Sequence, residues 1–166
     1  IISFIGIDVF YKIFYLVTQS KFKKVYLDKT KINDFIFLFN LINQKKNREN
    51  SFNHKKIKIN EHHKWFKKRV INDGSNMYIL KDLMGTRLGQ CRLDLINQEY
   101  YLDYSIDEQF HKNGLGKKII NLVLKKINKK KYNIYAKVLK NNISSNNIFK
   151  NFSKKSFKNS NVYKLK

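Results

Sequence analysis

The most constraining feature of the sequence is a strand, a short turn with two glycines and a helix, all within residues 101–124. Positions 101, 103 and 105 alternate with 102, 104 and 106, and this period of two is typical of a strand with two different faces. From position 115 onward the apolar residues recur at the spacing of one helix face, at Leu115, Ile119, Val123 and Ile127. The turn between them reads His111-Lys112-Asn113-Gly114-Leu115-Gly116-Lys117. We expect the rest of the chain to pack around this unit.

The two-glycine turn favours a binding place for phosphate oxygens. Glycine lets the backbone approach a ligand closely. The first turn of a helix offers free N–H donors and the positive end of the helix dipole. The alternative is a tight strand-to-helix connection without a ligand. The spacing matches neither the Walker A loop nor the three-glycine dinucleotide fingerprint, so both of those are excluded.

Length and cysteine content limit the class of protein. A chain of 166 residues suits one domain with a full core. Its mixture of strand and helix patterns predicts an α/β or α+β fold. The single cysteine, Cys91, excludes a disulfide within the chain and favours a reducing compartment, so we expect a cytoplasmic protein.

The formal net charge of +23 suggests a nucleic-acid partner at first sight. Nearly all of this charge is lysine, which is scattered along every predicted element. Abundant Lys, Asn, Ile, Phe and Tyr, with no proline, indicate a genome rich in A and T, and such a genome raises the lysine content by itself. We therefore do not predict nucleic acid as the main ligand. Small polyanions such as CoA or nucleotide sugars fit the charge equally well.

Residues 1–23 are interpreted as an N-terminal appendage or as the end of a preceding domain in a longer fusion, and residues 24–166 as the main domain. The first apolar run is too short for a membrane span and contains Asp8 and Lys12. It also lacks the basic start and the cleavage site of a signal peptide. No membrane span is predicted, and the oligomeric state is left open.

The remaining patterns predict an order of elements. A first strand at 24–27 leads to a helix capped by Thr30, and a second helix starts at Glu61 after a polar loop at 43–60. Strands at 77–80 and 88–95 form an antiparallel meander with the strand that begins at Tyr101. After the glycine turn and its helix come a strand, a short helix with a cap-like start and a final strand, at 134–138, 141–152 and 157–165.

The adjacent His62 and His63 suggest a metal site at first sight. Neighbouring residues on a helix point about 100° apart, so the two imidazoles cannot easily share one ion. The sequence contains no HExxH motif and no Cys/His cluster. We therefore predict no metal.

Two linked motifs resemble the GCN5-related N-acetyltransferase (GNAT) family. The family's Q/R-x-x-G-x-G/A segment corresponds to residues 111–116, with His111 in place of Gln or Arg. The family's A-x-V-x-x-x-N-x-x-S-x-x-x-F/Y signature appears at matching spacing in Ala136, Val138, Asn142, Ser145 and Phe149. The similarity covers residues 24–166 and implies an α+β fold, with a mixed, mostly antiparallel central sheet flanked by helices.

Three shorter pieces resemble the acetyltransferases that modify amino-sugar nucleotides on the pathways to pseudaminic, legionaminic and related nonulosonic acids. They are Arg48-x-x-Ser51-Phe52-Asn53, Glu61-His62-x-x-Trp65-Phe66 and Gly89-Gln90-Cys91-Arg92-Leu93-Asp94. This resemblance implies acetyl transfer from acetyl-CoA to the amine of a 4-amino-deoxy sugar nucleotide. The alternatives are the same fold acting on a protein N-terminus or a polyamine, and a non-catalytic domain that binds CoA or other anions.

The family resemblance also implies a set of residues that bind acetyl-CoA. The pantetheine amides are expected on the strand that ends at Ile106, the pyrophosphate on the N–H groups of residues 112–117, and the CoA arm beside the last helix. The full set is Tyr104, Ser105, Ile106, His111, Lys112, Asn113, Gly114, Leu115, Gly116, Lys117, Asn142 and Ser145.

The reaction needs a base for the ammonium proton and an acid for the leaving thiolate. Many relatives carry a tyrosine as the acid where this chain has Phe149, and some carry a glutamate where it has Lys137. The replacements that we expect are His62 or His63 as the base and Tyr104 or Ser105 as the acid. The predicted acceptor pocket comprises Arg48, His62, Trp65 and Arg92.

Overall fold

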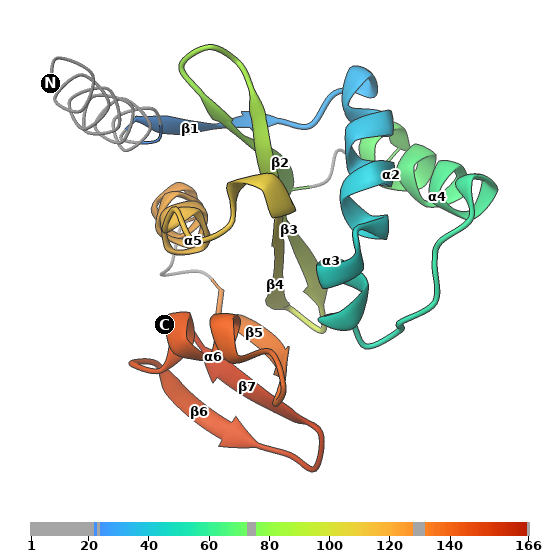
Figure 1. The fold of residues 1–166 in the computed structure, drawn as a ribbon. Coiled ribbons are helices and arrows are strands. Elements are labelled where there is room, and N and C mark those ends of the chain that lie inside the picture. The colour runs from blue at the N-terminus through green and yellow to red at the C-terminus, as the bar shows by residue number, and fades with distance from the viewer. Residues whose placement is uncertain (1–21, 23, 73–75, 128–131, 166) are drawn as a thin grey trace, which may run out of the picture.

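The computed structural model describes residue 22 and residues 24–72, 76–127 and 132–165. Its centre is a seven-stranded sheet in the order β1-β2-β3-β4-β5-β7-β6 (Figure 1). The strands are β1 (Val25–Lys29), β2 (Asn76–Asp82), β3 (Arg87–Ile96), β4 (Glu99–Ile106), β5 (Ile134–Leu139), β6 (Ser153–Ser156) and β7 (Ser160–Lys164). Only the β4–β5 pair is parallel. The predicted mixed and mostly antiparallel sheet is confirmed. The appendage predicted at 1–23 lies outside the described residues apart from residue 22.

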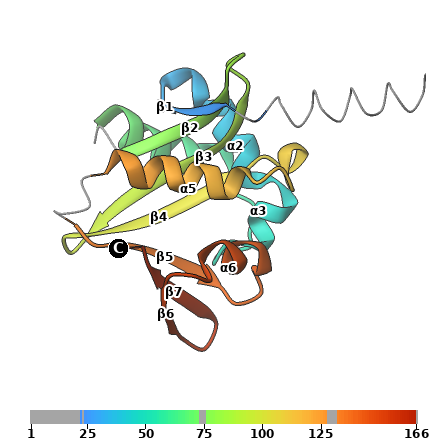
Figure 2. The ribbon, with the colours of Figure 1, turned by 90° about the vertical axis from the view of Figure 1, so that its left-hand side faces the viewer.

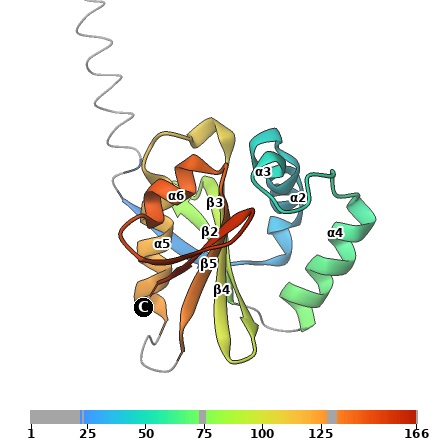
Figure 3. The same ribbon diagram turned by 90° about the horizontal axis from the view of Figure 1, so that it is seen from below.

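Helices cover both faces of the sheet. On one face lie α2 (Phe35–Asn43), α3 (Lys45–Glu49) and α4 (Ile59–Phe66), the last of which continues as the π-helical segment η2 (Lys67–Asn72). On the other face lie α5 (Leu115–Lys126) and α6 (Ile143–Phe149), and Figure 3 shows the two sets on opposite sides of the strands. The 3-10 turns η1 (Ile32–Asp34) and η3 (Glu108–Phe110) precede α2 and follow β4. Within the described ranges, no helix combines the length and apolar character needed to cross a membrane.

Alternation along the strands produces two apolar cores, one on each face. On the α5 side, Leu93 of β3 and Leu102 of β4 belong to a large buried cluster with the apolar face of α5. On the α2 side, Met77 and Ile79 of β2 pack with residues of α2 and α4. Neighbouring residues of β4 therefore project to opposite sides of the sheet. This alternation decides which residues of β4 face each half of the site described below.

The site is positioned by the β2–β3–β4 meander and by the place where β4 and β5 separate, which we call the split. The predicted antiparallel pairing of β2, β3 and β4 is confirmed, with one register shift between β2 and β3 at Leu80 and Lys81. In contrast, β4 and β5 pair only where Tyr100 and Tyr101 meet Ile134 and Tyr135. Beyond Tyr135, β5 is paired only along its other edge, with β7, and β4 and β5 separate toward the end of β4 (Figure 2).

Three local predictions are corrected by the structure. Thr30 does not cap α2, because η1 intervenes; the Oγ1 atom of Thr30 is buried without a hydrogen-bond partner among the described residues. The polar stretch at 43–60 is not a plain loop, because it contains α3 and the first residues of α4. The last segment is a hairpin of two strands, β6 and β7, in place of the single predicted strand.

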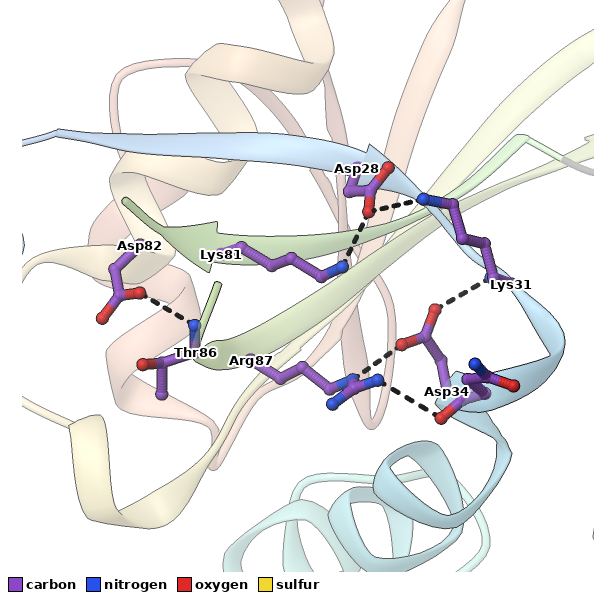
Figure 4. A network of polar contacts seen from close by, with 8 residues as sticks. Asp28, Lys31, Asp34, Lys81, Asp82, Thr86 and Arg87 are labelled. Carbon is purple, nitrogen blue, oxygen red and sulfur yellow. Dashed lines mark hydrogen bonds and ion pairs between the residues drawn. The ribbon is translucent and has the colours of Figure 1, made fainter. Parts of the chain in front are cut away.

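A polar network anchors the start of α2 to the sheet (Figure 4). The buried carboxylate of Asp34 accepts hydrogen bonds from the Lys31 backbone N–H at 2.8 Å and from Arg87 Nε at 2.7 Å. Beside it, Asp28 of β1 forms ion pairs with Lys81 at 2.7 Å and with Lys31 at 3.2 Å. These bonds tie η1 to β2 and β3, and so they fix where α2 lies on the sheet.

Candidate active site

A cavity of about 1400 Å³ is lined by residues from both sides of the split between β4 and β5. One end is formed by the turn before α5 and by α6. The other end is formed by α2, α3, α4 and the α2-side residues of β3 and β4. The two halves of the predicted site, which come from distant parts of the sequence, therefore line one continuous space.

The turn before α5 has the backbone shape of an anion site. Lys112 and Gly114 both adopt left-handed conformations, with φ of 63° and 68°. The first helical hydrogen bond of α5 runs from the Lys118 N–H to the Gly114 carbonyl at 3.2 Å. The preceding N–H groups therefore project beyond the helix end, where its dipole is positive. A non-glycine residue at positive φ is strained, and such strain is concentrated at functional sites.

Two predicted cofactor residues shape this turn through their side chains. His111 Nε2 lies 3.0 Å from the carbonyl oxygen of Ile106, which ties the turn back to the end of β4. The Asn113 amide donates to the carbonyls of Phe110, at 3.2 Å, and of His111, at 3.1 Å. These bonds hold the loop in the conformation that exposes its backbone N–H groups.

Packing, as well as any ligand, favours glycine at position 116. A Cβ atom at this position would lie 2.8 Å from Ile148 Cδ1 and 3.3 Å from the Tyr104 ring. By contrast, a Cβ atom at Gly114 would meet nothing within 4 Å, and there the positive φ is what favours glycine. The sequence pattern attributed both glycines to phosphate binding, whereas Gly116 also lets α5 approach α6 and β4 closely.

Tyr104 and Ser145 meet in the middle of the cavity. The Tyr104 hydroxyl lies 2.8 Å from Ser145 Oγ, and Ser145 N–H donates to the capping side chain of Asn142 at 3.1 Å. Burial raises the pKa of the Tyr104 phenol above its ordinary value, so the hydroxyl keeps its proton at neutral pH. Phe149 packs edge-on against the Tyr104 ring, with the ring centroids 6.2 Å apart. A phenol hydroxyl on β4 thus lies close to the position where many relatives carry a tyrosine on the last helix.

The α2 side of β4 presents Ser105 and Asp103, paired in register with Gln90 and Arg92 of β3. Arg92 Nη2 lies 3.5 Å from Asp103 Oδ2, and Gln90 Nε2 donates to the same oxygen at 3.2 Å. Sequence reasoning missed Asp103 as a member of the site. The signal that could have found it was its place in the strand alternation, two residues before Ser105.

His62 is buried among aromatic rings, and its side chain is only 3% exposed. The rings of Phe35, Phe39, Trp65 and Phe66 lie 5.0–6.1 Å from it, centroid to centroid. Burial lowers the pKa of this imidazole below its ordinary value near 6.5, so it is neutral at physiological pH. Its Nε2 atom has no hydrogen-bond partner within the described part of the chain.

The structure separates the two adjacent histidines and brings His62 together with two other predicted acceptor residues. His62 lines the cavity, whereas the exposed His63 does not. Trp65 lies one turn after His62 on α4, and the guanidinium of Arg92 stands 5.6 Å from its ring centroid. His62, Trp65 and Arg92 therefore form one wall of the cavity on the α2 side.

Arg48 lies at the cavity wall but is largely engaged by its own loop. Its Nε donates to the Ile42 carbonyl at 2.6 Å. Its Nη atoms donate to Ser51 Oγ, Asn53 O and Lys55 O at 2.9, 3.1 and 3.2 Å. Most N–H donors of Arg48, a predicted acceptor residue, are therefore used to hold residues 50–57 in place, and few remain for a ligand.

Neither a metal nor a cysteine nucleophile is indicated by the described residues. In the ranges that the structure covers, no group of three His, Cys, Asp or Glu side chains is placed to hold an ion. Burial raises the pKa of the Cys91 thiol well above its ordinary value, so the thiol stays protonated and unreactive.

Comparison with known proteins shows the family. The sequence profile of the Acetyltransferase (GNAT) family matches residues 39–153, which is more than half of the chain. The protein therefore belongs to the GNAT family of acetyltransferases and is an N-acetyltransferase of that family. A search of curated protein sequences finds no significant match.

Solved structures share the fold at low sequence identity. A domain from Methanocaldococcus jannaschii is 22% identical with a TM-score of 0.72, over 86% of this chain and 97% of that one. The spermidine N-acetyltransferase from Vibrio cholerae, in complex with CoA and spermine, is 15% identical with a TM-score of 0.71, over 84% and 92%. A ribosomal-protein-alanine N-acetyltransferase from Brucella melitensis is 13% identical with a TM-score of 0.67, over 83% and 96%. These likenesses concern the fold.

Proposed function

We propose that the protein transfers acetyl from acetyl-CoA to the amine of a 4-amino-deoxy sugar nucleotide, in the synthesis of nonulosonic acids for surface glycans. The observation that carries this proposal is the charge of the acceptor end of the cavity. Arg48, Arg92 and Lys137 line it. Arg92 is paired with the carboxylates of Asp94 and Asp103, whereas Lys137 forms no ion pair with the described residues. A cationic wall suits an anionic acceptor. The proposal places the reaction in the cytoplasm, in a catalytic domain that spans residues 24–166.

Acetyl-CoA fits the end of the cavity formed by α5 and α6. The left-handed residues before α5 and the positive charges of Lys112 and Lys117 suit the pyrophosphate, at the positive end of the helix dipole. The edge of β4 beyond Tyr101 offers backbone groups for the pantetheine amides, because β5 pairs only with the first part of β4. Asn142 and Ser145 lie beside this path. When bound there, acetyl-CoA would supply the acetyl group through its thioester.

The base and the acid lie on opposite sides of the sheet. His62 on the α2 side is neutral, and its unpaired Nε2 is buried. It can take the proton that the acceptor ammonium must lose through a bridging water molecule. Tyr104 projects to the α5 side and keeps its proton, so it can protonate the sulfur as the thioester C–S bond breaks. The amine nitrogen thereby gains the acetyl group, and CoA leaves as the thiol. Ser105, on the same strand, is positioned toward the acceptor.

A polyamine is the second candidate acceptor. Asp103, whose side chain is 46% exposed, and Glu61 supply carboxylates to the same cavity, and these groups suit a cationic amine. The related spermidine acetyltransferase binds spermine. The ion pair of Asp103 with Arg92 makes this candidate the weaker one, because Arg92 offsets the carboxylate charge and repels a polycation.

The test is release of free CoA thiol with a panel of amines. We expect tight binding of acetyl-CoA by calorimetry, and thiol release with 4-amino sugar nucleotides but not with spermidine or a peptide N-terminus. The control is Gly114→Val, in which a β-branched residue is forced to positive φ; we expect it to weaken acetyl-CoA binding about tenfold. Thiol release with spermidine alone would identify the second candidate, and failure to bind acetyl-CoA would exclude both.

A further inference from the structure

We propose that Phe52 and Lys137 form the subsite for the nucleoside diphosphate part of the acceptor, with the base stacked on Phe52 and the phosphates paired with Lys137. The inference deepens the proposed function and rests on an acceptor that carries a nucleotide. Neither residue was among those predicted for the site from the sequence motifs. The cationic side chains at the acceptor end of the cavity could bind any anionic part of the acceptor, so further observations are needed to assign the nucleotide to a place.

Lys137 projects away from the expected CoA pyrophosphate site. Its neighbours Ala136 and Val138 are buried in the core on the α5 side of the sheet. Lys137 itself is exposed and projects to the opposite face, because side chains alternate along a strand. There its ammonium stands over the Phe52 ring, 4.9 Å from the ring centroid, at the wall of the cavity. An anion bound at Lys137 therefore lies on the acceptor's side of the sheet.

Phe52 is held in position by the loop that surrounds Arg48. The Arg48 guanidinium bonds Ser51 and Asn53, the two neighbours of Phe52. Ser51 Oγ also donates to the Asn47 carbonyl at 2.6 Å. Despite this fixed backbone, the Phe52 ring is 55% exposed, which is high for a phenylalanine in an ordered loop. The ring is therefore presented at the cavity before any ligand arrives, which lowers the entropic cost of binding.

The chemistry of the pair matches a nucleotide. An exposed aromatic ring stacks on a nucleobase, and a lysine ammonium is a strong partner for phosphate oxygens. Lysine has three N–H donors, so it can bond phosphate while one side of the ammonium still faces the ring. With its nucleotide placed here, the acceptor's sugar extends into the cavity toward β4 and α4. A polyamine bound at this place would be repelled by the ammonium of Lys137.

The experiment is calorimetric titration with uridine, cytidine and guanosine diphosphates in the presence of saturating acetyl-CoA. Acetyl-CoA occupies its own site and leaves only the acceptor side free. We expect at least one diphosphate to bind, and we expect Lys137→Met and Phe52→Leu each to weaken it about tenfold, the size of a lost charged hydrogen bond or stacking contact. The matched controls are Lys155→Met and Phe157→Leu, because those residues form a similar pair, 5.6 Å apart, on the β6–β7 hairpin outside the cavity lining.

The outcomes separate this inference from the proposed function. The subsite is overturned if none of the three diphosphates binds, or if the Lys137 and Phe52 variants behave like their controls. It is also overturned if Lys137→Met weakens acetyl-CoA as much as it weakens the diphosphate, because the anion site would then belong to CoA. Diphosphate binding that depends on both residues supports the subsite even if no 4-amino sugar nucleotide is acetylated, a result that would count against the proposed function alone.

Discussion

A neutral imidazole at His62 gives the reaction a pH dependence that lies below the ordinary range of histidine. Because burial lowers the pKa of His62, the base form persists as the pH falls through about 6.5. We expect kcat/KM for the amino sugar to lose its His62-dependent part only below that value. The measurement is a pH–rate profile of wild type and of His62→Gln, with His63→Gln as the control.

The rates of wild type, His62→Gln and His63→Gln also measure how much the proposed base contributes to kcat. Loss of a general base costs on the order of a hundredfold in kcat. The fall in rate at low pH that we assign to His62 should be absent in His62→Gln. The exposed His63 should be replaceable with no change in rate or profile. A low-pH limb that survives unchanged in His62→Gln would show that another group is the base. Thermal unfolding of both variants separates a folding defect from a chemical one.

The Tyr104 hydroxyl provides a second test at this scale. Tyr104→Phe removes the proposed acid and leaves Ser145 Oγ without its partner at 2.8 Å. We expect kcat to fall about a hundredfold with little change in acetyl-CoA affinity. Ser145→Ala is the matched variant, because it removes the same hydrogen bond and keeps the phenol. Equal losses of kcat in the two variants would mean that the hydrogen bond, and not the phenol proton, is what the enzyme uses.

Some residues of the site were readable from sequence and others were not. The pattern at 141–145 predicted a cap-like helix start, and the Asn142 side chain does accept from the Ser145 N–H, because an N-cap is a local interaction. Asp103 carries no motif, and its importance depends on strand register with Arg92. Phe52 and Lys137 are 85 positions apart (137 minus 52), and their contact exists only in the folded chain.

At the scale of elements, close approach of β3 and β4 depends on Gly89. A Cβ atom at Gly89 would press on the Ser105 carbonyl oxygen, a backbone atom that cannot move without shifting β4. We expect Gly89→Ala to destabilise the fold by about 2–3 kcal/mol, the cost of overpacking a well-packed interior. Urea unfolding measures the loss.

Gly116→Ala is the matched comparison for Gly89→Ala. There the closest neighbour is Ile148 Cδ1, the end of a flexible side chain that can turn away. Alanine is also a better helix former than glycine, which offsets part of the strain. We therefore expect Gly116→Ala to cost clearly less stability than Gly89→Ala. If Gly89→Ala proves no more unstable than Gly116→Ala, the approach of β3 to β4 is more adaptable, or Ile148 less so, than their geometry indicates.

The sequence patterns predicted the long elements and several short ones, but they missed α3. The strands of the meander and α5 have enough repeats for their pattern to be read, and they were confirmed. The five-residue α3 is stabilised from outside the segment. Gln44 Nε2 donates to Asp107 at 3.0 Å, and the Lys46 N–H donates to Glu108 at 2.6 Å. Bonds between positions more than 60 residues apart leave no trace in local sequence.

At the scale of the whole molecule, the net charge of +23 opposes the compact state. Within the described part of the chain, seven ion pairs engage six lysines and arginines, so most of the described cations have no carboxylate partner. Salt screens such repulsion, because the Debye length falls from about 30 Å at 0.01 M to about 8 Å at 0.15 M.

Adding salt should therefore stabilise this protein. We expect the free energy of unfolding to rise on the order of 1 kcal/mol between 0.01 and 0.15 M KCl, since each exposed charge contact contributes only a few tenths. Urea unfolding at the two salt concentrations measures the change, and Arg87→Met is an informative companion. Arg87 pairs with the buried Asp34, so its removal should destabilise the fold at both concentrations by a similar amount. Stability that falls as KCl is added would mean that attractive ion pairs outweigh the repulsion, and that the lysine excess is balanced within the fold.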